Sequence, residues 1–149
     1  MKQYFLACIS SVLLTACSAS NCPQGNPQIT LMVKNKSLLA EVAQTQQSRV
    51  CGLSKRNNMP YNHAMLFVYP VNKVLKFWMK DTFIPLSIAF LDSDGVILKI
   101  AKMNTLHKNE KATLIFHQAA RYALEVNQGW FNENAIVVGD RVIFSLKEL

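Results

Sequence analysis

The chain has 149 residues, of which 50% are hydrophobic and 17% are charged. This length supplies the core of one domain and is short for two, and the hydrophobic fraction argues against a disordered chain. The formal net charge of +7 suits anionic partners. The longest basic run is Lys55-Arg56, however, so we expect a solvated basic surface and no nucleic-acid partner.

The N-terminus resembles the signal of a bacterial lipoprotein. A single basic residue precedes an apolar run at 5–14, and Leu14-Thr15-Ala16-Cys17 matches a lipobox. A transmembrane helix is the alternative, but the run is shorter than the roughly 20 residues that a bilayer requires. The resemblance implies a signal peptide at 1–16, a lipidated Cys17, and an exported protein anchored on the periplasmic side of a bacterial membrane. Ser18 after the cysteine points to the outer membrane if the cell is Gram-negative.

Residues 17–28 are small and polar and include Pro and Gly, as expected for a tether between the lipid and a folded domain. Cleavage and lipidation leave two further cysteines, Cys22 and Cys51. An exported protein can keep a disulfide, and a bridge between these two would close a loop of about 30 residues, worth roughly 3.5 kcal/mol. Two free thiols are the alternative, and the sequence leaves both open.

Residues 29–149 form the predicted domain. Short apolar runs, mostly with a period of two, predict strands, and they lie at 29–34, 38–44, 65–69, 86–92, 96–102, 121–126 and 141–146. Two segments, 46–56 and 127–135, have room for one or two helical turns each. The pattern predicts a single compact, mainly β domain, an antiparallel β-sandwich or flattened barrel with one or two short helices.

The chain shows no motif for a metal, a nucleotide or a catalytic triad. The histidines have no metal-ligand spacing, no serine stands in Gly-x-Ser-x-Gly, and the five glycines are scattered. The turn at 92–95 begins like a calcium loop, but its Gly is fourth and its twelfth residue is Met103. We therefore expect no metal and no cofactor. The histidines are His63, His107 and His117.

The stretch FWMKDTFIPLSIAF at 77–90 is apolar except for Lys80 and Asp81. Pro85 cannot donate to a strand ladder, so we expect a strand to end near Met79, an irregular loop to follow, and a new strand to begin at Leu86. Loops between rigid strands often carry binding groups.

Two interpretations of the charged pair remain open. Lys80 is a solvated lysine beside Trp78, or it belongs to a polar ligand-binding cleft with Trp78, Asp81, Arg49 and Arg121. Trp130 is expected in the core.

Several motifs resemble the domain of unknown function 192 family. They cover about residues 29–146, and the most specific is Phe77-Trp78-Met79-Lys80 followed by Ile84-Pro85-Leu86. The resemblance implies a compact, mostly β domain that is often exported and has no known activity. This chain has Ala64, Asp81 and Ser87 where the family usually has Gly, Asn and Asp. The remaining motifs are Arg49-x-x-Gly52-Leu53, Met59-Pro60, Met65–Pro70, Ala120–Val126, Gly129-Trp130 and Val138–Val142.

Together these observations predict a membrane-anchored envelope lipoprotein that acts as a non-catalytic binding or structural module. Its partner would be an anionic small molecule, a glycan or an envelope protein. The alternative is an envelope hydrolase or lyase that uses Lys80 or Asp81 as an acid or base. A third interpretation is an accessory subunit of an envelope assembly.

Overall fold

The computed structural model describes residues 22–23, 25–105 and 113–147. The predicted signal peptide at 1–16, the predicted lipidation site Cys17 and His107 lie outside the described residues. No helix in the described part of the chain is both long and apolar enough to cross a membrane.

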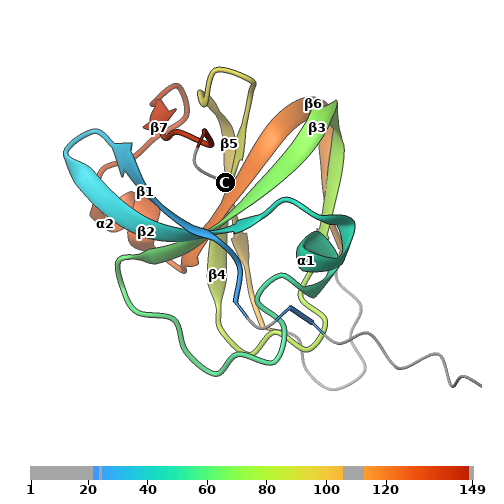
Figure 1. The fold of residues 1–149 in the computed structure, drawn as a ribbon. Coiled ribbons are helices and arrows are strands. Elements are labelled where there is room, and N and C mark those ends of the chain that lie inside the picture. Colours follow the sequence, from blue (N-terminus) through green and yellow to red (C-terminus); the bar gives the residue numbers. More distant parts are fainter. Residues whose placement is uncertain (1–21, 24, 106–112, 148–149) are drawn as a thin grey trace, which may run out of the picture.

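One seven-stranded sheet with the order β5-β4-β6-β3-β2-β1-β7 forms the frame of the domain (Figure 1). Two short helices accompany it. The elements in chain order are β1 (Gln28–Val33), β2 (Lys36–Ala43), α1 (Gln46–Cys51), β3 (His63–Trp78), β4 (Leu86–Leu91), β5 (Ile97–Met103), β6 (Thr113–Asn127), α2 (Trp130–Glu133) and β7 (Val142–Ile143). The predicted mainly β domain with short helices is confirmed.

The sheet differs in two details from a wholly antiparallel sandwich or barrel. Strands β2 and β3 pair in parallel, because the chain crosses over through α1 and a long loop between them. The sheet also does not close into a barrel. At one end, however, the turn before β5 meets the segment before β7: the Ile97 amide donates to the Asp140 carbonyl, and the Val142 amide donates to the Gly95 carbonyl. Gly95 must remain a glycine, since a Cβ there would lie 2.4 Å from the Val142 carbonyl oxygen.

Strands β3 and β6 are much longer than the sequence predicted. The apolar run at 65–69 ends at Pro70, where the expected strand stops, yet β3 continues to Trp78. Pro70 lies in a register shift between Val68 and Lys73, and such irregularities bend a strand. Beyond the shift, the outer half of β3 pairs with the outer half of β6, and Figure 1 shows both strands curving over together.

Contacts between aromatic rings show how far the outer arm of β3 bends back. Phe67 and Phe77 lie ten residues apart on β3, but their ring centroids are only 4.9 Å apart. Phe77 also contacts Phe90 of β4, which stacks on Phe116 of β6 at 4.6 Å. The outer arm of β3 and β6 therefore folds back over one face of the sheet and buries it.

Each face of the sheet carries an apolar core. The face covered by the arm holds Phe67, Phe77 and Phe90, and the opposite face holds Leu66, Leu124 and Trp130 beside α2. Alternation along β6 sends Ala123 to the first core and Leu124 to the second. Trp130 is buried, with 1% of its surface exposed, as expected for a core aromatic.

Candidate functional site

A cleft of about 350 Å³ opens between α1 and the bent arm of β3. We call it the α1 cleft. Helix α1 and the loop after it form one wall, and β3 from Phe67 to Trp78, with Met79 after it, forms the other, while Glu125 of β6 contributes from the sheet. Lys73, Lys76, Phe77 and Trp78 of the outer arm belong to this lining, so the bend of β3 helps to form the concavity.

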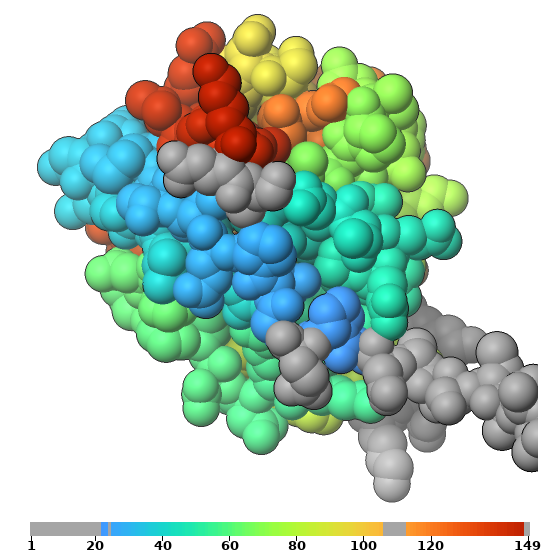
Figure 2. Space-filling view, viewed as in Figure 1, coloured from blue at the N-terminus to red at the C-terminus, as the bar shows by residue number. Residues whose placement is uncertain are grey.

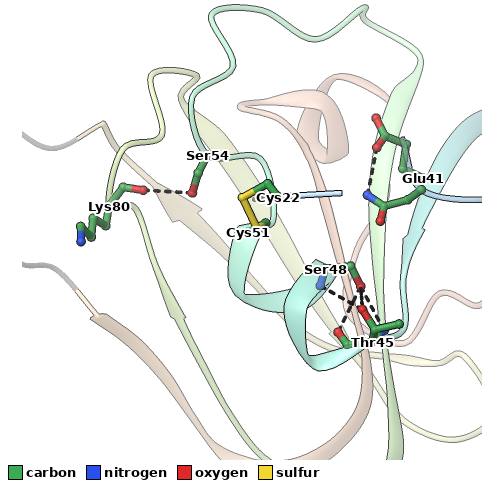
Figure 3. Close-up of a disulfide and its surroundings, with 8 residues drawn as sticks. Cys22, Glu41, Thr45, Ser48, Cys51, Ser54 and Lys80 are labelled. Carbon is green, nitrogen blue, oxygen red and sulfur yellow. Dashed lines mark hydrogen bonds between the residues drawn. A yellow bond between two sulfur atoms is a disulfide. The ribbon is translucent and has the colours of Figure 1, made fainter. Parts of the chain in front are cut away.

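Helix α1 is short, and its ends are well fixed. Thr45 caps its start: the Thr45 hydroxyl accepts from the Ser48 amide, and the Ser48 hydroxyl accepts from the Thr45 amide, each at 3.0 Å (Figure 3). Gly52 ends the helix at φ +48° and lies close to the ring of Phe67. A disulfide joins Cys51 at the end of α1 to Cys22 (Figure 3). In Figure 2 the blue N-terminal segment accordingly lies against the teal region that contains α1.

The loop between β3 and β4 runs as the sequence predicted, from the end of β3 at Trp78 to the start of β4 at Leu86. The Lys80 carbonyl accepts from the Ser54 hydroxyl at 3.2 Å, and the Asp81 carbonyl accepts from the Lys55 amide at 2.6 Å. Asp81 has φ +55°, a conformation that Asp and Asn tolerate better than most residues. Lys80 and Asp81 thus fasten this loop through their backbone, and Figure 3 shows the Lys80 side chain pointing away from Ser54.

Three cations line the α1 cleft: Arg49 of α1, and Lys73 and Lys76 of β3. Arg49 donates from Nη1 to the carbonyls of Gln44 and Val68, which holds its guanidinium 4.9 Å from the centre of the Tyr69 ring. The Lys73 ammonium lies at the same distance from that ring. Within the described ranges, none of the three cations forms an ion pair with a carboxylate.

Glu125 is the one carboxyl among the residues that line the cleft, and it is buried, with 4% of its surface exposed. It projects on the face of the apolar core that contains Ala123, and burial raises its pKa to about 8. Burial likewise raises the pKa of the Tyr69 hydroxyl; Arg49 opposes that shift and Glu125 adds to it. At neutral pH Glu125 is therefore mainly a neutral acid, and it leaves the charge of the three cations uncompensated.

The residues predicted as a ligand site separate into two groups. Arg49 and Trp78 line the α1 cleft. Lys80 and Asp81 are exposed and lie outside its lining, and the Arg121 guanidinium bonds the Pro70 carbonyl at the bend of β3. Among the described residues, no group of three metal-ligating side chains converges.

The sequence reasoning missed Tyr69, Lys73, Lys76 and Glu125. Lys73 and Lys76 follow Pro70, where the strand was expected to end. Glu125 did carry a signal, since it is a lone carboxylate inside the apolar run at 121–126. A charged residue in a strand buried on both faces is costly, and it is more informative than the exposed pair at Lys80 and Asp81.

Ser87 stands where the resemblance implied an aspartate. It lies on the face of β4 opposite Leu86, which lines the cleft, and it is buried. Its hydroxyl accepts from the Gly129 amide at 3.1 Å, at the start of α2. This position supports α2 and does not belong to the α1 cleft.

Comparison with known proteins identifies the family and two similar structures. The family model DUF192, described as an uncharacterised ACR, matches residues 29–144. A crystal structure from Sinorhizobium meliloti 1021, provisionally described as a transcription regulator, is 27% identical with a TM-score of 0.77, covering 82% of this chain and 97% of that one. A protein of unknown function from Novosphingobium aromaticivorans shares the fold at 24% identity and a TM-score of 0.74, covering 91% of this chain and 98% of that one.

No curated protein matches the chain. Since the family model spans residues 29–144, which is most of the sequence, the chain belongs to the DUF192 family.

Proposed function

We propose that this protein is a lipid-anchored envelope protein whose α1 cleft binds a small anionic ligand. The observation that carries the proposal is the convergence of Arg49, Lys73 and Lys76 on one cleft without a carboxylate partner in the described part of the chain. A volume of about 350 Å³ lies in the range of small-molecule sites. The lipobox at Leu14-Thr15-Ala16-Cys17 supports the anchor.

Arg49 is the residue best prepared to recognise the anion. Two backbone carbonyls hold its Nη1, and the Tyr69 ring lies beside the guanidinium plane. Among the described residues, no group hydrogen-bonds Nη2 or Nε of Arg49, so both remain for a ligand oxygen. A guanidinium held in this way loses little side-chain freedom when it binds a carboxylate or phosphate.

Glu125 supports the same function from the floor of the cleft. As a neutral acid it can donate a hydrogen bond to a ligand oxygen, which an ionised carboxylate cannot do. Glu125 lines the cleft, so its carboxyl group can reach a ligand oxygen there. The cleft thus combines three positive charges with one buried donor.

Calorimetric titration of the full chain against a panel of ligands tests the proposal. The panel contains inorganic phosphate, glycerol 3-phosphate, glucose as a neutral control and a short DNA duplex. The duplex is included because the Sinorhizobium meliloti relative is provisionally described as a transcription regulator. We expect binding of at least one small anion, and weakening of about tenfold or more in Arg49→Gln, because a hydrogen bond to a charged group contributes about 1.5 to 3 kcal/mol.

A charge-matched control separates the cleft from general basicity. Lys73→Gln with Lys76→Gln removes two charges from the cleft, while Lys99→Gln with Lys102→Gln removes two exposed charges from β5. Only the first pair should weaken anion binding. Equal loss in both pairs, or preference for the duplex over every small anion, would reject the proposal.

The envelope hydrolase or lyase remains the second candidate, and the raised pKa of Glu125 is what favours it. Lys80 and Asp81 lie outside the cleft lining, so Glu125 is the residue that could act there as a general acid. The described lining contains no histidine and no second carboxyl to serve as a base. The binding function is therefore preferred, and release of phosphate or sugar from the ligand during titration would favour the enzyme.

A further inference from the structure

The disulfide shortens the tether between the predicted lipid anchor and the domain. Cys17 and Cys22 are five residues apart in the sequence, and an extended chain of that length spans at most about 18 Å. Without the disulfide, the first backbone hydrogen bond to the sheet is at Pro27, whose carbonyl accepts from the Val42 amide of β2, and the corresponding span is about 36 Å. The Cys22–Cys51 bond thus reduces the reach of the domain by about half.

This shorter reach restricts which face can meet the membrane. A domain of this size is about 35 Å across, estimated from its radius of gyration. A tether of about 36 Å lets such a domain turn any face to the bilayer, whereas one of about 18 Å keeps the face around Cys22 near the surface. Cys51 belongs to the lining of the α1 cleft, and its Cα atom lies 5.7 Å from that of Cys22. The rim of the cleft is therefore held close to the membrane.

The side chains around this rim suit a membrane surface of anionic lipid. Trp78 and Val50 line the cleft and are 45% and 50% exposed, and Phe83 on the following loop is 59% exposed. Aromatic side chains favour the interfacial layer of a bilayer, and lysines are attracted by anionic head groups. Lys76 lies between the cleft and solvent, and Lys80 is exposed nearby, whereas Asp81 is the one acidic side chain of the 79–85 loop.

We infer that the α1 cleft lies against the membrane and takes the head group of an anionic phospholipid. The inference rests on the proposed function, since it names the anion that the cleft binds. A soluble phosphate ester could offer the cleft the same phosphate group. The short tether favours the phosphate of a lipid head group, because it holds the cleft near the bilayer.

Quenching of tryptophan fluorescence by brominated lipids measures whether the cleft meets the bilayer. Trp78 is half-exposed at the cleft and Trp130 is buried on the other face of the sheet, so the difference between the parent and Trp78→Phe isolates the emission of Trp78. The mature lipidated protein is reconstituted into vesicles of phosphatidylcholine with phosphatidylglycerol, with brominated acyl chains as quenchers. We expect strong quenching of the Trp78 emission and none of the Trp130 emission. We also expect binding to prefer phosphatidylglycerol, and this preference should fall about fivefold for each of Lys73 and Lys76 that is replaced by Gln.

A longer tether tests whether the short distance between the lipid and Cys22 is what holds the cleft near the membrane. An insertion of five Gly and Ser residues between residues 20 and 21 restores a span of about 36 Å, keeps the disulfide and lets the domain move away, so the quenching of Trp78 should fall markedly. Equal quenching with and without the insertion would overturn the inference, as would a mature N-terminus that carries no lipid when its mass is measured.

The outcomes also separate this inference from the proposed function. Unquenched Trp78 in a protein that binds glycerol 3-phosphate in solution would reject the membrane ligand and retain anion binding. Absence of binding both to that ester and to phosphatidylglycerol vesicles would reject both.

Discussion

Glu125→Gln should unfold with a higher free energy than the parent, and this difference should grow as the pH rises. The carboxyl lies in an apolar core beside the α1 cleft, and burial raises its pKa from 4.5 to about 8. Gln has nearly the same size as the protonated acid and cannot ionise. The variant therefore removes the titration while the shape of the core is retained.

The sign and size of the effect follow from proton binding in the two states. In the unfolded chain the carboxyl loses its proton near pH 4.5, whereas the folded protein keeps it until about pH 8. Between these values the unfolded state binds fewer protons, so rising pH favours unfolding by about 1.4 kcal/mol per pH unit. The stability contributed by Glu125 is thus fully present below pH 4.5 and is lost by about pH 8. The summed loss is about 5 kcal/mol, a large share of the usual stability of a domain.

Urea unfolding of the parent and Glu125→Gln across this pH range measures the effect. We expect the two free energies of unfolding to be similar near pH 4.5 and to diverge steadily in favour of the variant up to about pH 8. Tyr69, whose pKa Glu125 helps to raise, titrates above this pH range, and the remaining groups are common to both proteins and cancel in the difference. A difference that does not change with pH would refute the argument, because it would show that Glu125 ionises normally in the folded state.

Three further perturbations have defined outcomes. Glu41→Gln should change the pH dependence of stability in the opposite direction. Arg56 bonds the Glu41 carboxylate and lowers its pKa, so the stability that Glu41 contributes is present above pH 4.5 and is lost as the pH falls through the lowered pKa. We expect about 1 kcal/mol by urea unfolding at pH 7, and no loss there would contradict the ion pair. Reduction of the Cys22–Cys51 disulfide should cost about 3.5 kcal/mol, and unfolding with a thiol reagent should titrate neither cysteine before reduction. Gly52→Ala should cost about 1 to 3 kcal/mol, since φ +48° with ψ −132° is a conformation that essentially only glycine adopts, and an unchanged denaturation midpoint would be the contrary result.

Local sequence signals predicted most of the elements. The alternation at 29–34, 86–92 and 96–102 appears in the structure as β1, β4 and β5, with ends that differ by at most one residue. The predicted loop between Trp78 and Leu86 is confirmed, and the segments 46–56 and 127–135 contain α1 and α2. These features depend on neighbouring residues, which a single sequence displays directly.

The length of β3 was not predictable in the same way. Pro70 normally ends a strand, and only the pairing of the outer arm with β6 shows that the chain bends there and continues to Trp78. The parallel pairing of β2 with β3 is likewise a result of how distant segments meet.

The α1 cleft depends on that bend. Arg49 and Trp78 attracted notice as motif residues, but Lys73, Lys76 and Glu125 join them only because β3 folds back over the sheet. The sequence by itself determined the β domain, its family resemblance and the position of the irregular loop. Which charges converge was decided by the tertiary structure alone, since convergence depends on strand curvature and pairing between residues far apart in the chain.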